Sequence, residues 1–333
     1  MVRRVVPVTR AVYLDAYLKI LREIGSPFAG QLHAYGLPEI GEDPSCMLVP
    51  VRPSMTFVVA AARGEGIDDL SHRGLANVCD SDLTDQFKAV VRGRPTLLDA
   101  LRLWCMLAVL EDNCASCWLS PTGNSVRLCS HIHSLDVHPG LEYTQWIQNK
   151  IAIDIVRLYL GANWMPRTIA FDATFPIRPS MAKAWPNSRL IVGQKATWID
   201  IPIDALAAPP LAGATEGLDG GAVPDPPREV VGVLRQLIPS YLPEGSLSIE
   251  RAAKIVGMSV RTLQRELQNA SVSYSRLLEE VRYQRASELL HDPAVRITDI
   301  AHAVGYDDPS HFSRAFRRFA GTTPSRFREL RSG

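Results

Sequence analysis

Two short stretches near the C-terminal end carry side chains whose chemistry suits the reading of DNA bases. In the first stretch, two leucines stand four residues apart, Leu263 and Leu267, with arginine and glutamine between and around them. Arginine presents paired donors that match the edge of guanine in the major groove, and glutamine matches adenine. Because the leucines form one apolar stripe of a helix, the remaining side chains are expected to face outward. This predicted outward face consists of Arg261, Thr262, Gln264, Arg265 and Gln268.

The second stretch repeats this arrangement with Phe312 and Phe316 as the apolar stripe. Its predicted outward face consists of Ser310, His311, Ser313 and Arg314. An ordinary solvated helix face would have a similar composition, so neither stretch indicates DNA binding when taken alone. The argument for base reading is that the two stretches belong to a longer pattern that occurs twice in the same register.

That longer pattern covers residues 248–267 and 298–316. In each copy, a short apolar segment with a small alanine ends at a glycine, Gly257 or Gly305, and a second amphipathic segment follows. A glycine allows the left-handed backbone that a sharp turn between two helices requires. The sequence therefore predicts two helix-turn-helix units.

Each predicted helix has a residue suited to its N-terminal cap. The hydroxyls of Ser248 and Thr298 are expected to cap the first helices of the two units. Ser259 is expected to cap the second helix of the first unit, and Asp308 that of the second unit. Pro309 would then occupy the first helical position, where its missing N–H is not needed.

Residues 274–290 lie between the two units and contain neither proline nor glycine. Their apolar residues recur at helical spacing, which predicts one linking helix about 25 Å long. Two units fixed to its ends would lie roughly one turn of DNA apart, so one chain could read two successive major grooves.

These features resemble the C-terminal domain of the AraC/XylS family of bacterial transcription regulators. The resemblance rests on the two units, on the linking-helix stretch 282–290 and on the closing stretches 312–319 and 321–328. It implies base contacts from Arg261, Gln264 and Arg265 in the first unit, and from Ser310, His311, Ser313 and Arg314 in the second. Pro309 stands where many members have a polar residue, which argues against base contact at the start of the second reading helix.

The resemblance also implies a set of partners. These are double-stranded promoter DNA, RNA polymerase, a small-molecule effector and a second copy of the chain, with no cofactor. It implies an effector-controlled regulator, with an activator expected, although the residues themselves leave activation and repression equally open.

The distribution of charge agrees with a DNA-binding C-terminal end. The 333 residues carry a net charge of +1, with 36 lysines and arginines against 35 acidic residues. From Arg228 onward there are 16 basic and 12 acidic residues, so this end is positive and the remainder is negative. No apolar run is long enough for a membrane span, and Arg3 and Arg4 precede too short an apolar stretch for a signal peptide. We therefore expect a cytoplasmic protein.

A stretch rich in proline, glycine and alanine separates two parts of the chain. It predicts a flexible linker at 209–227 between a domain at 1–208, expected to sense an effector and to dimerise, and a DNA-binding domain at 228–333. The expected fold class is α+β for the first domain and all-α for the second. In the first domain, helices are expected at about 10–24, 96–111 and 144–160. A β-hairpin with strands 114–119 and 126–132, and strands near 167–174 and 195–201, complete it.

The first domain also resembles the sensory halves of ornithine-utilisation regulators of the same family, through residues 164–171, 185–194, 199–202 and 206–210. Such halves are thought to bind small effectors and to pair two chains. Nothing in the sequence identifies the effector or the residues that bind it.

An alternative is a metal- or redox-sensing regulator that uses Cys114, Cys117, Cys129 and His131, since thiolates and imidazoles bind zinc and copper. Against this, residues three apart on a strand face opposite sides, and cysteine is commonly a small buried residue. An enzyme is also considered, but the sequence contains no phosphate-binding glycine loop, nucleophile elbow or His-Glu-x-x-His motif. We therefore expect no catalytic activity.

Overall fold

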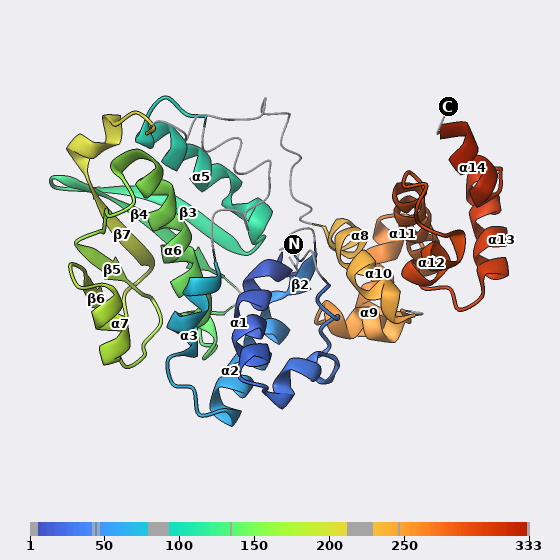
Figure 1. The fold of residues 1–333 in the computed structure, drawn as a ribbon, viewed down its shortest axis with the longest axis horizontal. Helices are drawn as coiled ribbons and strands as arrows, with labels where there is room; N and C mark the ends of the chain where they lie inside the picture. Colours follow the sequence, from blue (N-terminus) through green and yellow to red (C-terminus); the bar gives the residue numbers. More distant parts are fainter. Residues whose placement is uncertain are drawn as a thin grey trace.

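The computed structural model describes residues 6–41, 44, 47–78, 93–133, 135–211, 229–245 and 247–331. The N-terminal part contains a five-stranded sheet with helices packed around it, and the part from residue 229 onward is entirely helical (Figure 1). This is the fold class that the sequence predicts. No helix among the described residues is long and apolar enough to cross a membrane.

The five-stranded sheet has the order β3-β4-β7-β5-β6. Its strands are β3 (Ala115–Thr122), β4 (Ser125–Ile132), β5 (Thr168–Ala170), β6 (Arg189–Ile191) and β7 (Thr197–Pro202). All neighbouring pairs are antiparallel except β5 and β6. The predicted hairpin is confirmed as β3 and β4, with Gly123 at its turn in the left-handed region, φ 55°.

Helices pack around this sheet and bury a large apolar core. They are α1 (Ala11–Glu23), α2 (Val51–Gly64), α3 (Leu70–Arg73), α5 (Leu97–Glu111), α6 (Leu141–Leu160) and α7 (Pro179–Ala184). The three predicted helices correspond to α1, α5 and α6, and the others were not predicted. Trp146 of α6, Tyr17 of α1 and Phe57 of α2 are among the largest fully buried side chains.

A second, two-stranded sheet joins the two halves of the molecule. Strand β1 (Val8–Arg10) pairs antiparallel with β2 (Leu48–Pro50). Val8 and Leu48 belong to the same apolar core as the C-terminal helices, and Val6 belongs to it as well. The structure thus shows a packed contact between N-terminal strands and the C-terminal half, which the sequence does not predict.

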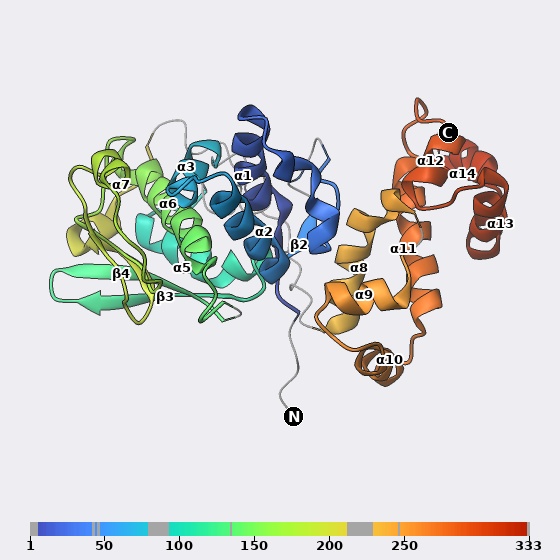
Figure 2. The same ribbon diagram turned by 90° about the horizontal axis from the view of Figure 1, so that it is seen from below.

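The C-terminal half contains seven α-helices in its described residues, and a 3-10 helix (Leu242–Glu244) follows the first of them. The α-helices are α8 (Val230–Tyr241), α9 (Ile249–Ile255), α10 (Val260–Asn269), α11 (Tyr274–Leu289), α12 (Ile297–Ala303), α13 (Pro309–Ala320) and α14 (Pro324–Arg331). Helices α9 and α10 form the first helix-turn-helix unit, α12 and α13 form the second, and α11 runs between them (Figure 2). The residues predicted to link the units correspond to α11.

Both predicted turn glycines have the backbone conformation that the turn requires, with φ 65° for Gly257 and 79° for Gly305. A Cβ atom at Gly305 would lie 2.9 Å from the carbonyl oxygens of Leu242 and Gly245. Only glycine therefore fits at this point, where the turn of the second unit approaches the end of α8. The domain boundaries at 208 and 228 stay predictions, because most of the expected linker, residues 212–227, lies outside the described residues.

Candidate nucleic-acid interface

Helix α10 presents the face predicted for the first unit. The Ser259 hydroxyl caps the helix by accepting a hydrogen bond from the Thr262 N–H at 3.2 Å. Leu263 and Leu267 are buried, with exposed fractions of 0% and 2%. On the opposite face, four of the five predicted residues are exposed, namely Arg261, Gln264, Arg265 and Gln268. The fifth, Thr262, is half-buried, and its hydroxyl lies 2.9 Å from that of Ser259, so it also supports the cap.

Helix α13 presents the corresponding face of the second unit. The Asp308 carboxylate caps it by accepting a hydrogen bond from the Ser310 N–H at 2.7 Å, which holds the pKa of Asp308 below its ordinary value. Pro309 occupies the first helical position, as predicted. Phe312 and Phe316 are buried. Of the predicted outward residues, Ser310, His311 and Arg314 are exposed and Ser313 is half-buried.

The prediction that Thr298 caps the first helix of the second unit is wrong. Helix α12 begins at Ile297, two residues before the start that a Thr298 cap would give, and its capping position is Arg296, which makes no side-chain cap hydrogen bond. Instead, Nε and Nη2 of Arg296 donate to the two carboxylate oxygens of Asp299 at 2.8 and 3.0 Å. This ion pair across the first turn, with an acid near the positive helix end, takes the place of a hydroxyl cap. The Ser248 cap of α9 is confirmed by its hydrogen bond from the Arg251 N–H.

Helix α11 is fixed to the second unit by a residue whose role the sequence reasoning did not identify. Nη2 of Arg282 donates a hydrogen bond to the Gly305 carbonyl oxygen at 2.9 Å, and the guanidinium lies 4.6 Å from the centre of the Tyr306 ring. Arg282 therefore binds the linking helix to the turn between α12 and α13. This contact limits rotation of one recognition helix relative to the other.

The ion pairs of the C-terminal half divide its basic residues into two groups. Most arginines outside the recognition helices have an acidic partner, as in Arg251 with Glu244 and Arg276 with Glu280. The same holds for Arg235, Arg285, Arg296 and Arg326. On α13 itself, Arg318 is also paired, with Glu279 of α11. Arg265 is 62% exposed and has only a marginal contact of 4.0 Å with Glu266.

The second group lies on α9, α10 and α13. Among the described residues, no acidic side chain lies within 4.0 Å of the charged groups of Lys254, Arg261, Arg314 and Arg317. Unpaired cations are thus concentrated on the two recognition helices and on the helix that precedes the first of them. Such groups are available to phosphates and base edges without first breaking an ion pair.

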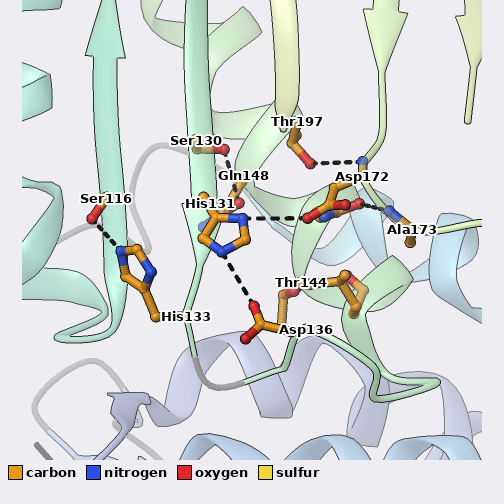
Figure 3. Close-up of polar contacts among 12 residues, drawn as sticks. Ser116, Ser130, His131, His133, Asp136, Thr144, Gln148, Asp172, Ala173 and Thr197 are labelled. Carbon is orange, nitrogen blue, oxygen red and sulfur yellow. Dashed lines mark hydrogen bonds and ion pairs between the residues drawn. The ribbon is translucent and has the colours of Figure 1, made fainter. Parts of the chain in front are cut away.

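The four residues considered for metal or redox sensing do not form a site. In the β3–β4 hairpin, Cys117 lies opposite Ser130 and Cys129 lies opposite Trp118, so the two thiols face opposite sides of the sheet. His131 instead lies between two carboxylates, 3.2 Å from Asp136 and 3.3 Å from Asp172 (Figure 3).

Across the residues that the structure covers, no group of three or more histidine, cysteine and acidic side chains is placed to hold a metal ion. Burial raises the pKa of the Cys129 thiol to about 11 and that of Cys117 even further. Since the thiolate is the form that binds metals and reacts with oxidants, burial also disfavours redox sensing at these residues. The positions of Cys114, Cys117, Cys129 and His131 therefore do not support the alternative of a metal or redox sensor.

Comparison with known proteins assigns the C-terminal half. Residues 252–330 match the family described as "Helix-turn-helix domain". Over 81 residues the chain is 36% identical to the ornithine utilization regulator of Pseudomonas aeruginosa, covering 24% of each chain. Over 85 residues it is 36% identical to the transcriptional activator RhaS of Escherichia coli, covering 25% of this chain and 31% of RhaS.

The matched region thus spans about a quarter to a third of the length of these curated relatives. Among solved structures, the transcriptional regulator CdpR from Pseudomonas aeruginosa aligns over 95% of this chain and 96% of its own. That alignment has 18% sequence identity and a TM-score of 0.40.

Proposed function

We propose that this chain, which belongs to the AraC family of helix-turn-helix transcription regulators through its C-terminal half, binds promoter DNA with α10 and α13 in successive major grooves. The observation that carries the proposal is the placement of arginines without an acidic partner among the described residues, Arg261, Arg314 and Arg317, on these two helices. On the other helices of the C-terminal half, by contrast, most arginines are paired with acids, namely Arg235, Arg251, Arg276, Arg285, Arg296 and Arg326. A protein that binds specific DNA sequences needs phosphate contacts for affinity, and it needs free hydrogen-bond donors to recognise the base edges.

The base-reading roles are assigned by exposure and position. In the first unit, Arg261, Gln264 and Arg265 read bases, and Gln268 lies one turn further along the same face. Among the residues predicted to read bases in the second unit, Arg314 and His311 have the longest exposed side chains, while Ser310 and Ser313 are short. The Asp308 carboxylate lies 3.7 Å from His311 and would repel a nearby phosphate, so the second unit contributes less to affinity than the first.

The remaining parts of the proposal concern control. The N-terminal half binds a small-molecule effector and pairs two copies of the chain, and the DNA-bound protein contacts RNA polymerase and activates transcription. The matched relatives named as an activator and as a regulator of ornithine utilization support control of this kind. Contact between β1, β2 and α8 gives the N-terminal half a direct connection to the DNA-binding helices.

Binding of the full-length chain to its selected DNA site should depend steeply on salt. Recovery of a site from a random duplex library is expected to give two half-sites about one helical turn apart. Because several lysines and arginines release counterions on binding, the logarithm of affinity should fall with the logarithm of salt concentration with a slope of magnitude about 4 to 8. Titrations of a fluorescent duplex at five salt concentrations measure this slope. A slope near zero, or a library that converges on no sequence, would contradict the proposed function.

A further inference from the structure

A cavity lies in the N-terminal half between helices α1, α2, α5 and α6 and the β3–β4 hairpin. Its volume is about 60 Å³, which is several times the roughly 10 to 15 Å³ that one water molecule requires and leaves room for a small ligand. Its walls are mainly apolar and include Leu14, Met55, Trp104, Leu128 and Ile151. A cavity of this kind excludes strongly hydrated molecules and favours a ligand with a substantial apolar part.

The charged groups of this cavity all have the same sign. Among its described lining residues, Glu111 and Asp112 are acidic, and there is no lysine, arginine or histidine. Glu111 accepts a hydrogen bond from the Tyr13 hydroxyl at 3.2 Å and lies 3.9 Å from Nε of Arg10, so its charge is partly balanced. The charge of Asp112 has no such balance among the residues that the structure describes.

The two oxygens of Asp112 have different surroundings. Oδ1 accepts hydrogen bonds from the Cys114 N–H at 3.1 Å and from the Cys114 thiol at 2.9 Å. Oδ2 has no donor among the described residues, and the side chain lines the cavity. Burial raises the pKa of Asp112 to about 6, since a carboxylate without a cation is unfavourable in apolar surroundings. At neutral pH this group remains largely ionised and lacks only a cationic partner.

We propose that this cavity is the effector site and that it takes a small organic cation, a protonated amine with an apolar body, whose ammonium group binds Asp112. The inference rests on the proposed function, in which the N-terminal half senses an effector. An ammonium donor meets the free Oδ2, and its apolar body replaces water against Trp104 and Ile151. A carboxylate ligand would instead be repelled by both acids.

The same carboxylate lies next to the contact between the two halves. Asp112 forms an antiparallel bridge with Thr9 of β1, and Thr9 also lines the cavity. The next residue, Asn113, holds β1 by three hydrogen bonds, accepting from the Val8 N–H at 2.9 Å and donating to the carbonyl oxygens of Val8 at 3.1 Å and Val6 at 2.9 Å.

Strand β1 has two sides with different neighbours. Thr9 faces the cavity, whereas Val6 and Val8 pack in the apolar core that contains α8. Helix α8 in turn packs against α10, the first recognition helix. A ligand that binds Asp112 and displaces the segment 111–113 would therefore change the packing of α8, and through it the position of α10.

Titration of the full-length protein with three six-carbon probes tests the ligand class. The probes are n-hexylamine, n-hexanol and sodium hexanoate, which share an apolar chain and differ in charge. Calorimetry at pH 7.5, together with intrinsic tryptophan fluorescence to which Trp104 of the cavity wall contributes, is expected to show n-hexylamine binding about tenfold to hundredfold more tightly than n-hexanol, with hexanoate weakest. Equal affinity for the three probes, or tighter binding of hexanoate, would overturn the proposal.

The matched variant Asp112→Asn keeps the shape and the acceptor for Cys114 but removes the charge. It is expected to bind n-hexylamine at least about tenfold more weakly than wild type and n-hexanol equally well. Asp136→Asn, which removes an acid outside the cavity, is expected to bind all three probes as wild type does. Unchanged n-hexylamine binding by Asp112→Asn, with folding verified by circular dichroism, would show that this carboxylate does not hold the ligand.

The pH dependence gives an independent measurement. A cation favours ionised Asp112, so binding should release protons and n-hexylamine affinity should fall as the pH drops from 7 through about 6 to 5. The other groups near Asp112 are Glu111, Tyr13, Arg10, Cys114 and Cys117, and burial raises the pKa values of Tyr13 and Cys117 beyond this pH range. In Asp112→Asn the affinity should vary less over this range than in wild type. Equal pH profiles for the two proteins would contradict the assignment.

The effect on DNA distinguishes this inference from the proposed function. Saturating n-hexylamine is expected to change the Kd of the full-length wild-type protein for its selected site by about tenfold, and to leave that of Asp112→Asn unchanged. An unchanged wild-type Kd would overturn the effector role of the cavity, although salt-dependent DNA binding would still support the proposed function. Loss of specific DNA binding with cation binding intact would overturn the proposed function alone.

Discussion

Replacing Arg265 by alanine is expected to weaken binding to the selected DNA site by about 1 to 3 kcal/mol and to remove the preference at one or two base pairs. Arg265 lies on the outward face of α10, 62% exposed and with only a 4.0 Å contact to Glu266. Its guanidinium is therefore free to form paired hydrogen bonds with a guanine edge. Binding of the variant to a library of single-base operator variants measures both effects.

Three further substitutions separate base reading from general attraction to DNA. Lys254→Ala, on α9, is expected to weaken binding to all DNA sequences alike, because Lys254 would contact only the phosphate backbone of the DNA. Arg276→Ala serves as the control, since this arginine is paired with Glu280 and should change affinity little. Arg314→Ala is expected to resemble Arg265→Ala in the other half-site with a smaller loss. If Arg265→Ala keeps wild-type affinity and base preference, α10 does not read DNA with this face.

The C-terminal fold is predictable from the sequence because its pattern is local and occurs twice. Caps, turn glycines and apolar stripes all lie within about 20 residues of each other, so Ser259, Gly257 and Leu263 specify one unit without reference to distant parts of the chain. The exception is Thr298, where a hydroxyl suggested a cap and the Arg296–Asp299 ion pair provides the first turn instead. A bidentate pair of this kind is visible only once the side chains are placed.

The N-terminal half is less predictable because several of its elements are short and depend on distant contacts. Strands β1, β2 and β6 have three residues each, too few for an alternating pattern to be recognised. The cavity is equally hard to predict from the sequence, because its walls come from several elements whose residues are spread between Thr9 and Ala152. In the sequence, Asp112 is only a charged residue at the end of a predicted helix. Its place in the wall of an apolar cavity, with no cationic partner among the described residues, appears only in the fold.

The contact between the halves is also invisible in the sequence, although it bears on regulation. The Tyr241 hydroxyl at the end of α8 donates to the Gly36 carbonyl oxygen at 3.1 Å. Glu244 accepts a hydrogen bond from the Glu39 N–H at 3.0 Å, lies 3.6 Å from His33 and pairs with Arg251 of α9. These polar contacts and the apolar contact at β1 and β2 hold the first unit against the N-terminal half. The second unit, by contrast, is stabilised largely by its own aromatic side chains.

The dependence of the second unit on those side chains leads to the prediction that Phe316→Ala destabilises it by about 3 to 5 kcal/mol. Phe316 is 2% exposed, and its ring lies 5.2 Å from Tyr283, 5.7 Å from Phe312 and 5.3 Å from Phe327. These rings join α11, α13 and α14, so the cavity left by the substitution opens at the point where all three helices meet. Hydrogen exchange should show faster opening of these helices, with α9 and α10 little changed.

Phe319→Ala on the same helix is the matched control. Phe319 stacks on Tyr283 with ring centres 5.4 Å apart, but it is 41% exposed, so its removal should destabilise the unit by less than about 1 kcal/mol. In a nuclease footprint, the Phe316→Ala variant should no longer protect the half-site bound by α13, but it should still protect the half-site bound by α10. If protection of both half-sites is lost together, the two units unfold as one cooperative body. The contact of Arg282 on α11 with Gly305 would then couple unfolding of the second unit to that of the first.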